Sequence, residues 1–124
     1  MTSFDAKVIE DIPAHRFVML GGIGRDGDEA EGWHTVYLLP AEPGIMPDMI
    51  STRDLVAGET VRVTITGAPV WRVEAAEAVP AGTLVQVAAD GRAKNYRPAD
   101  GSYVGYTTHS AEPGEIVEIV RKAD

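Results

Sequence analysis

A glycine-rich segment near the middle of the N-terminal half is the first part of this sequence whose residue types could do chemistry. Gly22-Ile23-Gly24-Arg25-Asp26-Gly27 matches the glycine pattern of a dinucleotide-binding loop. Such a loop must open a helix, because the helix N–H groups bind the pyrophosphate. Here Asp28, Glu29 and Glu31 follow instead, and their carboxylates would repel phosphate. The pattern therefore predicts a connection between two strands.

The acidic run from Asp26 to Glu31 offers the carboxylate oxygens that Ca²⁺ prefers. An EF-hand also needs ligands at alternate positions, a glutamate at the twelfth position and a helix on each side. The run lacks the full set. We expect a solvated acidic loop and no metal site.

The three histidines, His15, His34 and His109, are scattered singly. None has the spacing that places two imidazoles on one face of a helix or strand, and the chain has no G-x-S-x-G nucleophile motif. We expect no catalytic residue, no cofactor and no enzymatic activity. An enzyme that uses His34 or His109 with nearby carboxylates is left open as one alternative.

Composition narrows the classes of protein further. The chain has 124 residues, of which 44% are hydrophobic and 24% charged, which predicts one globular core. The formal charge of −8 disfavours nucleic acid as a partner. No cysteine is present, so disulfides and thiolate metal sites are excluded. Met1–Lys7 has no signal-peptide pattern, and no apolar run is long enough to cross a membrane, so we expect a soluble protein.

Short β-rich segments bounded by turns are the elements that must position any site. The clearest is 59–65, where Val61, Val63 and Ile65 alternate with polar residues. Six more segments are rich in β-branched or aromatic residues: 17–20, 35–39, 70–73, 83–87, 103–107 and 115–120. Asp90-Gly91 predicts a hairpin between 83–87 and 94–96. One short helix is compatible with Glu74–Ala78, where Pro80 would end it.

An internal repeat organises these segments into two related units. Ile12-Pro13-Ala14-His15-Arg16-Phe17-Val18 resembles Val79-Pro80-Ala81-Gly82-Thr83-Leu84-Val85. Further along, 56–63 resembles 112–119 when their Gly-Glu pairs are superposed, and the two motifs keep the same order. The pattern predicts an all-β fold, a compact β-sandwich or small barrel built from two related β-units, with at most one short helix.

The predicted domain organisation follows from the repeat. Residues 12–124 form a single β domain with a pseudo-repeat of 12–66 and 79–120. Residues 1–11 precede the first predicted strand and are polar, so we expect a mobile N-terminal arm. Phe4 would be its apolar anchor, ordering against a partner by strand addition.

Aromatic and basic residues are the candidates for contacts with other proteins. Trp33 and Trp71 are expected in the core or at a subunit contact. Arg92, Lys94 and Arg97 help to make the charge uneven. Residues 1–70 carry 11 acidic and 5 basic groups, a net charge of −6, whereas 71–124 carry 8 and 6, a net charge of −2. A charge-complementary protein contact in the second half is one interpretation, and an ordinary solvated face is the other.

The C-terminal part, Val73–Val120, resembles the capsid decoration or cement proteins of tailed bacteriophages. The similar pieces occur in order: Val79-Pro80-Ala81-Gly82-Thr83-Leu84-Val85-Gln86-Val87, Asp90-Gly91-Arg92-Ala93, Gly101-Ser102-Tyr103-Val104-Gly105-Tyr106 and Ala111-Glu112-Pro113-Gly114-Glu115-Ile116-Val117-Glu118-Ile119. The first half departs from the pattern, since its loops are longer and Asp48-Met49-Ile50 replaces the Val-Gly element.

The resemblance implies a structural virion protein that binds the exterior of a capsid and stabilises the head by bridging capsomers. It would be made in the host cytoplasm, act as a homotrimer and contact the major capsid protein, with no nucleic acid or membrane partner. The candidate capsid or subunit contacts are Phe4, Lys7, Trp33, Trp71, Arg92, Lys94 and Arg97. The alternative is a small β-barrel module that binds a ligand or protein through the long segment Gly21–Pro47.

Overall fold

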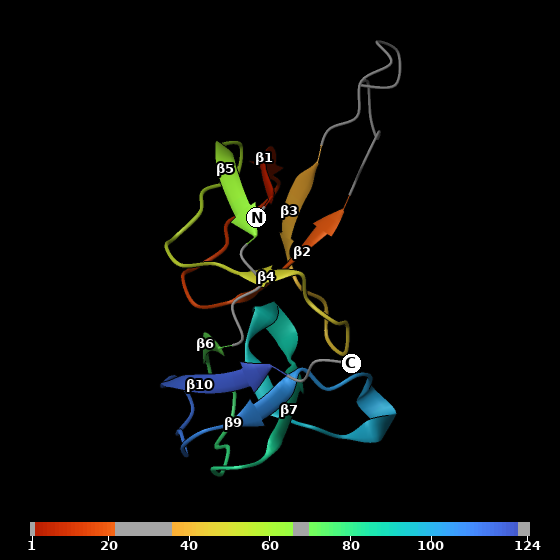
Figure 1. Ribbon diagram of the computed structural model, residues 1–124, viewed down its shortest axis with the longest axis vertical. Coiled ribbons are helices and arrows are strands. Elements are labelled where there is room, and N and C mark those ends of the chain that lie inside the picture. Colours follow the sequence, from red (N-terminus) through yellow and green to blue (C-terminus); the bar gives the residue numbers. More distant parts are fainter. Residues whose placement is uncertain (1, 22–35, 66–69, 122–124) are drawn as a thin grey trace.

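The protein is built from β-strands and turns arranged as two units along the long axis of the molecule (Figure 1). This computed structural model describes residues 2–21, 36–65 and 70–121. The glycine-rich segment, the acidic run, His34 and Trp33 lie outside the described residues.

Each unit contributes one five-stranded sheet. The N-terminal unit contains β1 (Thr2–Val8), β2 (Phe17–Gly21), β3 (Tyr37–Pro40), β4 (Met49–Ile50) and β5 (Thr60–Ile65), in the sheet order β4-β2-β3-β1-β5. The C-terminal unit contains β6 (Val70–Glu74), β7 (Leu84–Val87), β8 (Ala93–Asn95), β9 (Gly105–Thr107) and β10 (Ile116–Arg121), in the order β6-β10-β9-β7-β8. Two one-turn 3₁₀ helices, η2 (Ala89–Gly91) and η3 (Pro98–Asp100), flank β8.

The predicted all-β class is confirmed, and each of the seven predicted segments overlaps an observed strand. The predicted hairpin joins β7 to β8, with Asp90 at φ 63° and Gly91 at φ 73°. The helix predicted at Glu74–Ala78 does not form. Glu74 is the last residue of β6, and the amides of Ala75 and Ala76 donate to the carbonyls of other strands and loops, so tertiary pairing overrides helix propensity.

The repeat is visible in individual hydrogen bonds. In the N-terminal unit the hydroxyl of Ser51 donates to the carbonyl of Pro13 at 2.6 Å and accepts the amide of Arg16 at 3.1 Å. In the C-terminal unit the hydroxyl of Thr107 donates to Pro80 and accepts from Thr83 at the same two distances. We call each of these arrangements a hydroxyl clamp. Both clamps fix the turn that leads into a strand, β2 in one unit and β7 in the other.

The second repeated motif, 56–63 and 112–119, also has the same side-chain hydrogen bond in both copies. The carboxylate of Glu59 accepts the amide of Val56 at 2.7 Å, and that of Glu115 accepts the amide of Glu112 at 2.8 Å. The strand pairing agrees with this equivalence. The pairs β1 with β5 and β6 with β10 are antiparallel, as are β2 with β4 and β7 with β9. The two predicted copies are therefore two copies of one five-stranded topology.

The C-terminal sheet closes on itself, whereas the N-terminal sheet stays open between β4 and β5 among the described residues. In the N-terminal unit β1 pairs in parallel with β3, whereas in the C-terminal unit β9 pairs with β10 and an isolated bridge, Ala75 to Ala93, joins the remaining edges. A Cβ on Gly105 would collide with the carbonyl of Val120, so glycine permits the approach of β10. In the N-terminal unit the position equivalent to Gly105 is Met49 on β4. There, β4 and β5 are not paired in the described residues.

Each sheet packs around its own cluster of buried hydrophobic side chains. The N-terminal cluster includes Val8, Ile12 and Leu38, and the C-terminal cluster includes Val73, Val85 and Ile119. Two residues of the N-terminal unit, Phe17 and Ala41, belong to the C-terminal cluster instead. The shared core expected from the repeat is thus limited to the junction between the units.

Residues 1–11 do not form the arm expected from the sequence. Thr2–Val8 is β1, which pairs with β3 on one side and β5 on the other. Ala6 and Val8 are buried, Phe4 packs against the same cluster, and Asp5 and Lys7 are exposed, so the strand is amphipathic. β1 is already a strand of this sheet, paired with β5 from Thr2 to Lys7 and with β3 at Lys7 and Val8, so it is not a free arm awaiting strand addition.

The duplicated clamp makes a prediction for stability. Ser51→Ala and Thr107→Val each remove a buried hydroxyl, since both residues are at most 4% exposed, and leave a partly buried carbonyl and amide without this partner. Each change should lower the free energy of unfolding by about 1–3 kcal/mol in urea denaturation. The exposed neighbour Thr52 provides the control, because Thr52→Ala should change it by less than about 0.5 kcal/mol. Equal values for Ser51→Ala and Thr52→Ala would contradict the role of the clamp.

Candidate interaction surfaces

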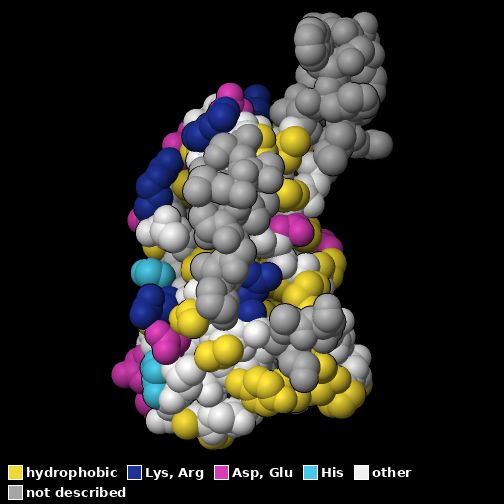
Figure 2. Space-filling model, viewed as in Figure 1, with side chains coloured by type: hydrophobic (Ala, Val, Ile, Leu, Met, Phe, Trp, Pro, Cys, Tyr) yellow, Lys and Arg dark blue, Asp and Glu magenta, His cyan; other side chains and the backbone are white. Residues whose placement is uncertain are grey.

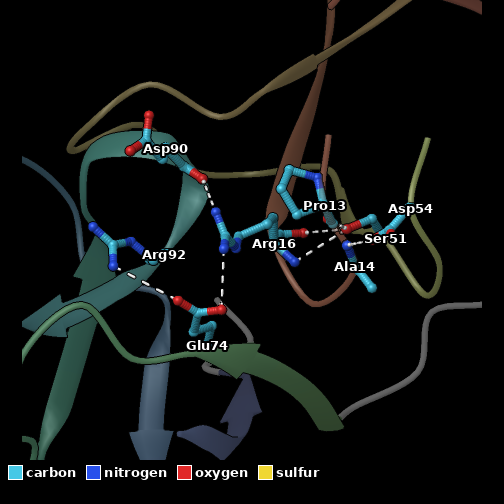
Figure 3. A network of polar contacts seen from close by, with 8 residues as sticks. All are labelled: Pro13, Ala14, Arg16, Ser51, Asp54, Glu74, Asp90 and Arg92. Carbon is cyan, nitrogen blue, oxygen red and sulfur yellow. Dashed lines mark hydrogen bonds and ion pairs between the residues drawn. The ribbon is translucent and has the colours of Figure 1, made fainter. Parts of the chain in front are cut away.

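The junction between the units is held by a network of charged groups (Figure 3). One guanidinium nitrogen of Arg16 lies 3.0 Å from the Glu74 carboxylate, and Arg92 lies 3.6 Å from the other oxygen of Glu74. Arg16 also donates to the carbonyl of Asp90 at 3.4 Å. The hydroxyl clamp of Ser51 fixes the backbone of Arg16, so the repeat motif positions the residue that reaches into the other unit.

An aromatic contact lies beside this network. The rings of Phe17 and Trp71 are 6.0 Å apart, and both side chains are buried. The guanidinium of Arg121 lies 4.2 Å from the centre of the Trp71 ring, which is a cation–π geometry. These contacts bury the start of β2 against the core of the C-terminal unit.

A loop of the N-terminal unit gives the junction a third contact. Gly44, in the loop between β3 and β4, donates its amide to the carbonyl of Val87 at 3.1 Å and accepts the amide of Ser102 at 3.0 Å. Gly44 has φ +77°, and a Cβ there would collide with the carbonyl of Asp100. Charged, aromatic and backbone contacts together connect the two units.

The basic residues of β8 and the turn after it are bound to carboxylates. Lys94 lies 2.8 Å from Asp100, and its hydrogen bond and charge lower the pKa of Asp100. Arg97 lies 3.2 Å from Glu77, which also accepts the side-chain amide of Asn95 at 2.7 Å. Burial alone would raise the pKa of Glu77, but these hydrogen bonds and the Arg97 charge outweigh it, so the pKa is lowered.

The other notable surface is apolar. Figure 2 shows hydrophobic side chains gathered over the part of the C-terminal unit where β7 and β9 lie. Tyr106 on β9 is 43% exposed and Val120 on β10 is 41% exposed. Ile45 and Met46, in the loop that docks at the junction, are also exposed.

The predicted contact residues do not form one patch. Arg92, Lys94 and Arg97 lie together on and around β8, whereas Phe4 and Lys7 lie on β1 of the other unit. Trp71 is 6% exposed and packs inside the molecule. Of the described candidates, Lys7 and Arg97 are the ones with exposed side chains.

The sequence did not point to Arg16 and Glu74 as residues of the junction. Nor did it point to Tyr106 and Val120 as residues of the exposed apolar surface. A signal for β1 was present, because extending the repeat toward the N-terminus aligns Phe4, Ala6 and Val8 with Trp71, Val73 and Ala75. The junction pair carried no signal, because Arg16 and Glu74 are 58 residues apart.

Two features are absent from residues 2–21, 36–65 and 70–121, a metal-binding cluster and a membrane-spanning helix. Among these residues, histidine and carboxylate side chains nowhere form a group of three that could hold a metal ion. Nor does any helix in this part of the chain have the length and apolar character needed to cross a bilayer.

Comparison with known proteins defines the class. A sequence model of the phage cement protein family matches residues 4–122. The chain therefore belongs to the phage cement protein family, and it is a structural protein of the phage head. The resemblance found in the C-terminal part thus extends over both units.

A solved structure has the same fold. The N base of head fiber gp8.5 in bacteriophage phi29 matches with a TM-score of 0.82 and 22% sequence identity, over 98% of this chain and 93% of that chain. Because the identity is low, this likeness is one of fold. No curated protein matches the chain.

The junction network can be tested by Glu74→Gln, which leaves Arg16 and Arg92 facing a neutral amide. Arg16 and Glu74 have side chains 14% and 24% exposed, so the lost charged hydrogen bonds should lower the free energy of unfolding by about 1–3 kcal/mol. Asp5→Asn breaks the exposed pair with Arg62 and should cost less than about 1 kcal/mol. Chemical denaturation measures both, and a Glu74→Gln loss no larger than that of Asp5→Asn would refute the assignment.

The lowered pKa of Glu77 predicts a pH dependence. The unfolded chain binds a proton on this carboxyl at higher pH than the folded protein does, so the contribution to stability is complete above the ordinary glutamate pKa and is lost as pH falls below about 4.3. Stability measured between pH 6 and 3 should fall less steeply for Glu77→Gln than for the unchanged protein. Arg97→Gln keeps the Asn95 bonds and should give an intermediate slope. Identical slopes for all three proteins would contradict this.

Proposed function

We propose that this protein binds the outer surface of a phage capsid as a homotrimer and stabilises the head by bridging capsomers. The observation that carries the proposal is the extent of the family match, which covers residues 4–122 and so both β-units. The similar phi29 protein is a head fiber, which also supports attachment to a head.

The several kinds of contact at the junction suit a bridging role. A bridge between capsomers resists expansion only if its own parts do not move apart, and here Arg16, Phe17 and Gly44 each connect the units by a different kind of contact. A trimer that engages several capsid subunits also gains effective concentration, so that weak single contacts add up to stable attachment.

The charges of the described residues suggest where capsid contacts lie. Arg92 and Lys94 have partly buried side chains paired with carboxylates within the chain, so they maintain the fold. Lys7 and Arg97 are exposed and remain our candidates for polar contacts with the major capsid protein. Trp33 also remains a candidate, whereas Trp71 contributes to the junction.

Nothing described favours the alternative of a ligand-binding module. That alternative depended on the segment Gly21–Pro47. Within it, the described loop after β3 packs Ala41 and Gly44 against the C-terminal unit. This part of the segment therefore serves the junction between units.

The proposal is tested with phage particles that lack the protein. Adding purified protein should give saturable co-sedimentation, and the temperature at which a dye detects released DNA should rise. Lys7→Gln and Arg97→Gln should weaken binding, while Arg62→Gln, at another exposed cation, is the matched control and should not. Absence of binding would refute the capsid role, and binding without a rise in release temperature would refute stabilisation.

A further inference from the structure

A row of apolar side chains crosses the outer face of the C-terminal sheet. Val70 on β6 is opposite Val120 on β10, Val120 is opposite Tyr106 on β9, and Tyr106 is opposite Leu84 on β7. Because side chains alternate along a strand, the row faces outward while the next residues along each strand, such as Ile119 and Val85, are buried. Residues directly opposite one another in neighbouring strands make these side chains adjacent.

Two further tyrosines lie next to the row. The amide of Tyr96 donates to the carbonyl of Leu84 at 3.0 Å, and the rings of Tyr96 and Tyr103 meet edge to face at 5.3 Å. We call this set the tyrosine row, and its members are Val70, Leu84, Tyr96, Tyr103, Tyr106 and Val120. Figure 2 shows hydrophobic side chains gathered over β7 and β9, the strands that carry Leu84 and Tyr106.

The internal repeat shows what the same face does in the N-terminal unit. Phe17 and Ile50 are opposite each other in β2 and β4, as Leu84 and Tyr106 are in β7 and β9. Ala41 takes the place of Tyr96, since its amide donates to the carbonyl of Phe17 at 2.9 Å. Phe17 and Ala41 are buried in the C-terminal cluster, and Ile50 packs against it. In the N-terminal unit this face therefore receives another β-unit of the same chain.

We propose that the tyrosine row is the contact surface through which a second copy of this chain binds. This inference rests on the proposed function, because it places the subunit contact of the capsid-bound homotrimer. The only β-unit seated on this kind of face in the described structure belongs to this chain, and a second copy supplies such a unit. When one copy's row meets a different surface of the next copy, three copies close into a ring if the rotation is 120°.

Charge supports a contact between like copies at this place. Each copy carries a formal charge of −8, so two copies repel each other over most of their surface. The tyrosine row carries no charge, and the flanking Arg72 and Glu118 are paired with each other at 2.9 Å. Tyrosine and valine side chains can be desolvated there without leaving a charge unpaired, and tyrosine is common in the centre of protein interfaces.

The closing experiment measures the molar mass of the purified protein in solution over a range of concentrations, by light scattering or sedimentation. Tyr106→Lys and Val120→Lys place a charge in the row at positions already about two-fifths exposed. Ile116→Lys is the matched control, because Ile116 lies on the same outward face of β10, is 38% exposed and is opposite Glu74 outside the row. A cooperative unfolding transition in each of the three variants establishes that all are folded.

We expect the unchanged protein and Ile116→Lys to form trimers. The concentration at which half of the trimers dissociate should be about tenfold higher or more for the two row variants than for the unchanged protein. Monomers of the unchanged protein at every concentration, or trimers unaffected by both row variants, would overturn the inference. Capsid co-sedimentation of the same proteins separates the two proposals. Row variants that stay trimeric but lose capsid binding would assign the row to the capsid protein instead. Trimers that need the row but ignore capsids would refute the proposed function alone.

Discussion

The burial of Phe17 in the core of the neighbouring unit is the constraint on which the rest of this structure depends. Each unit has roughly 60 residues, a size at which a single core leaves much apolar surface in contact with water. Phe17 lies at the start of β2 yet packs on Trp71, so a residue of the N-terminal unit completes the core of the C-terminal unit. Arg16, the neighbour of Phe17, makes its charged contacts with the C-terminal unit at the same place.

The two units keep the same local bonds and differ in what covers their faces. Ser51 and Thr107 make the same pair of hydrogen bonds, so the turn into the second strand is identical in kind. Leu84 occupies the place of Phe17, but in the described residues no further unit packs on it. A duplicated fold thus carries two copies of one surface, of which one is used inside the chain and the other is exposed.

The ion pairs show how the charges of this acidic chain are distributed. Many of the basic side chains, including Arg16, Lys94 and Arg97, lie within ion-pair distance of a carboxylate of the same chain. The formal charge of −8 shows that carboxylates remain in excess over the basic side chains.

The sequence by itself determined the all-β class, seven of the strands, the repeat and the family resemblance, because these depend on side-chain period, turn residues and local motifs. It did not reveal β1, whose polar residues at Asp5 and Lys7 hide an amphipathic strand that only its partners β3 and β5 stabilise. It also could not place the junction. Arg16 meets Glu74 across 58 residues, and that contact exists because two sheets with separate cores pack together, which no local pattern encodes.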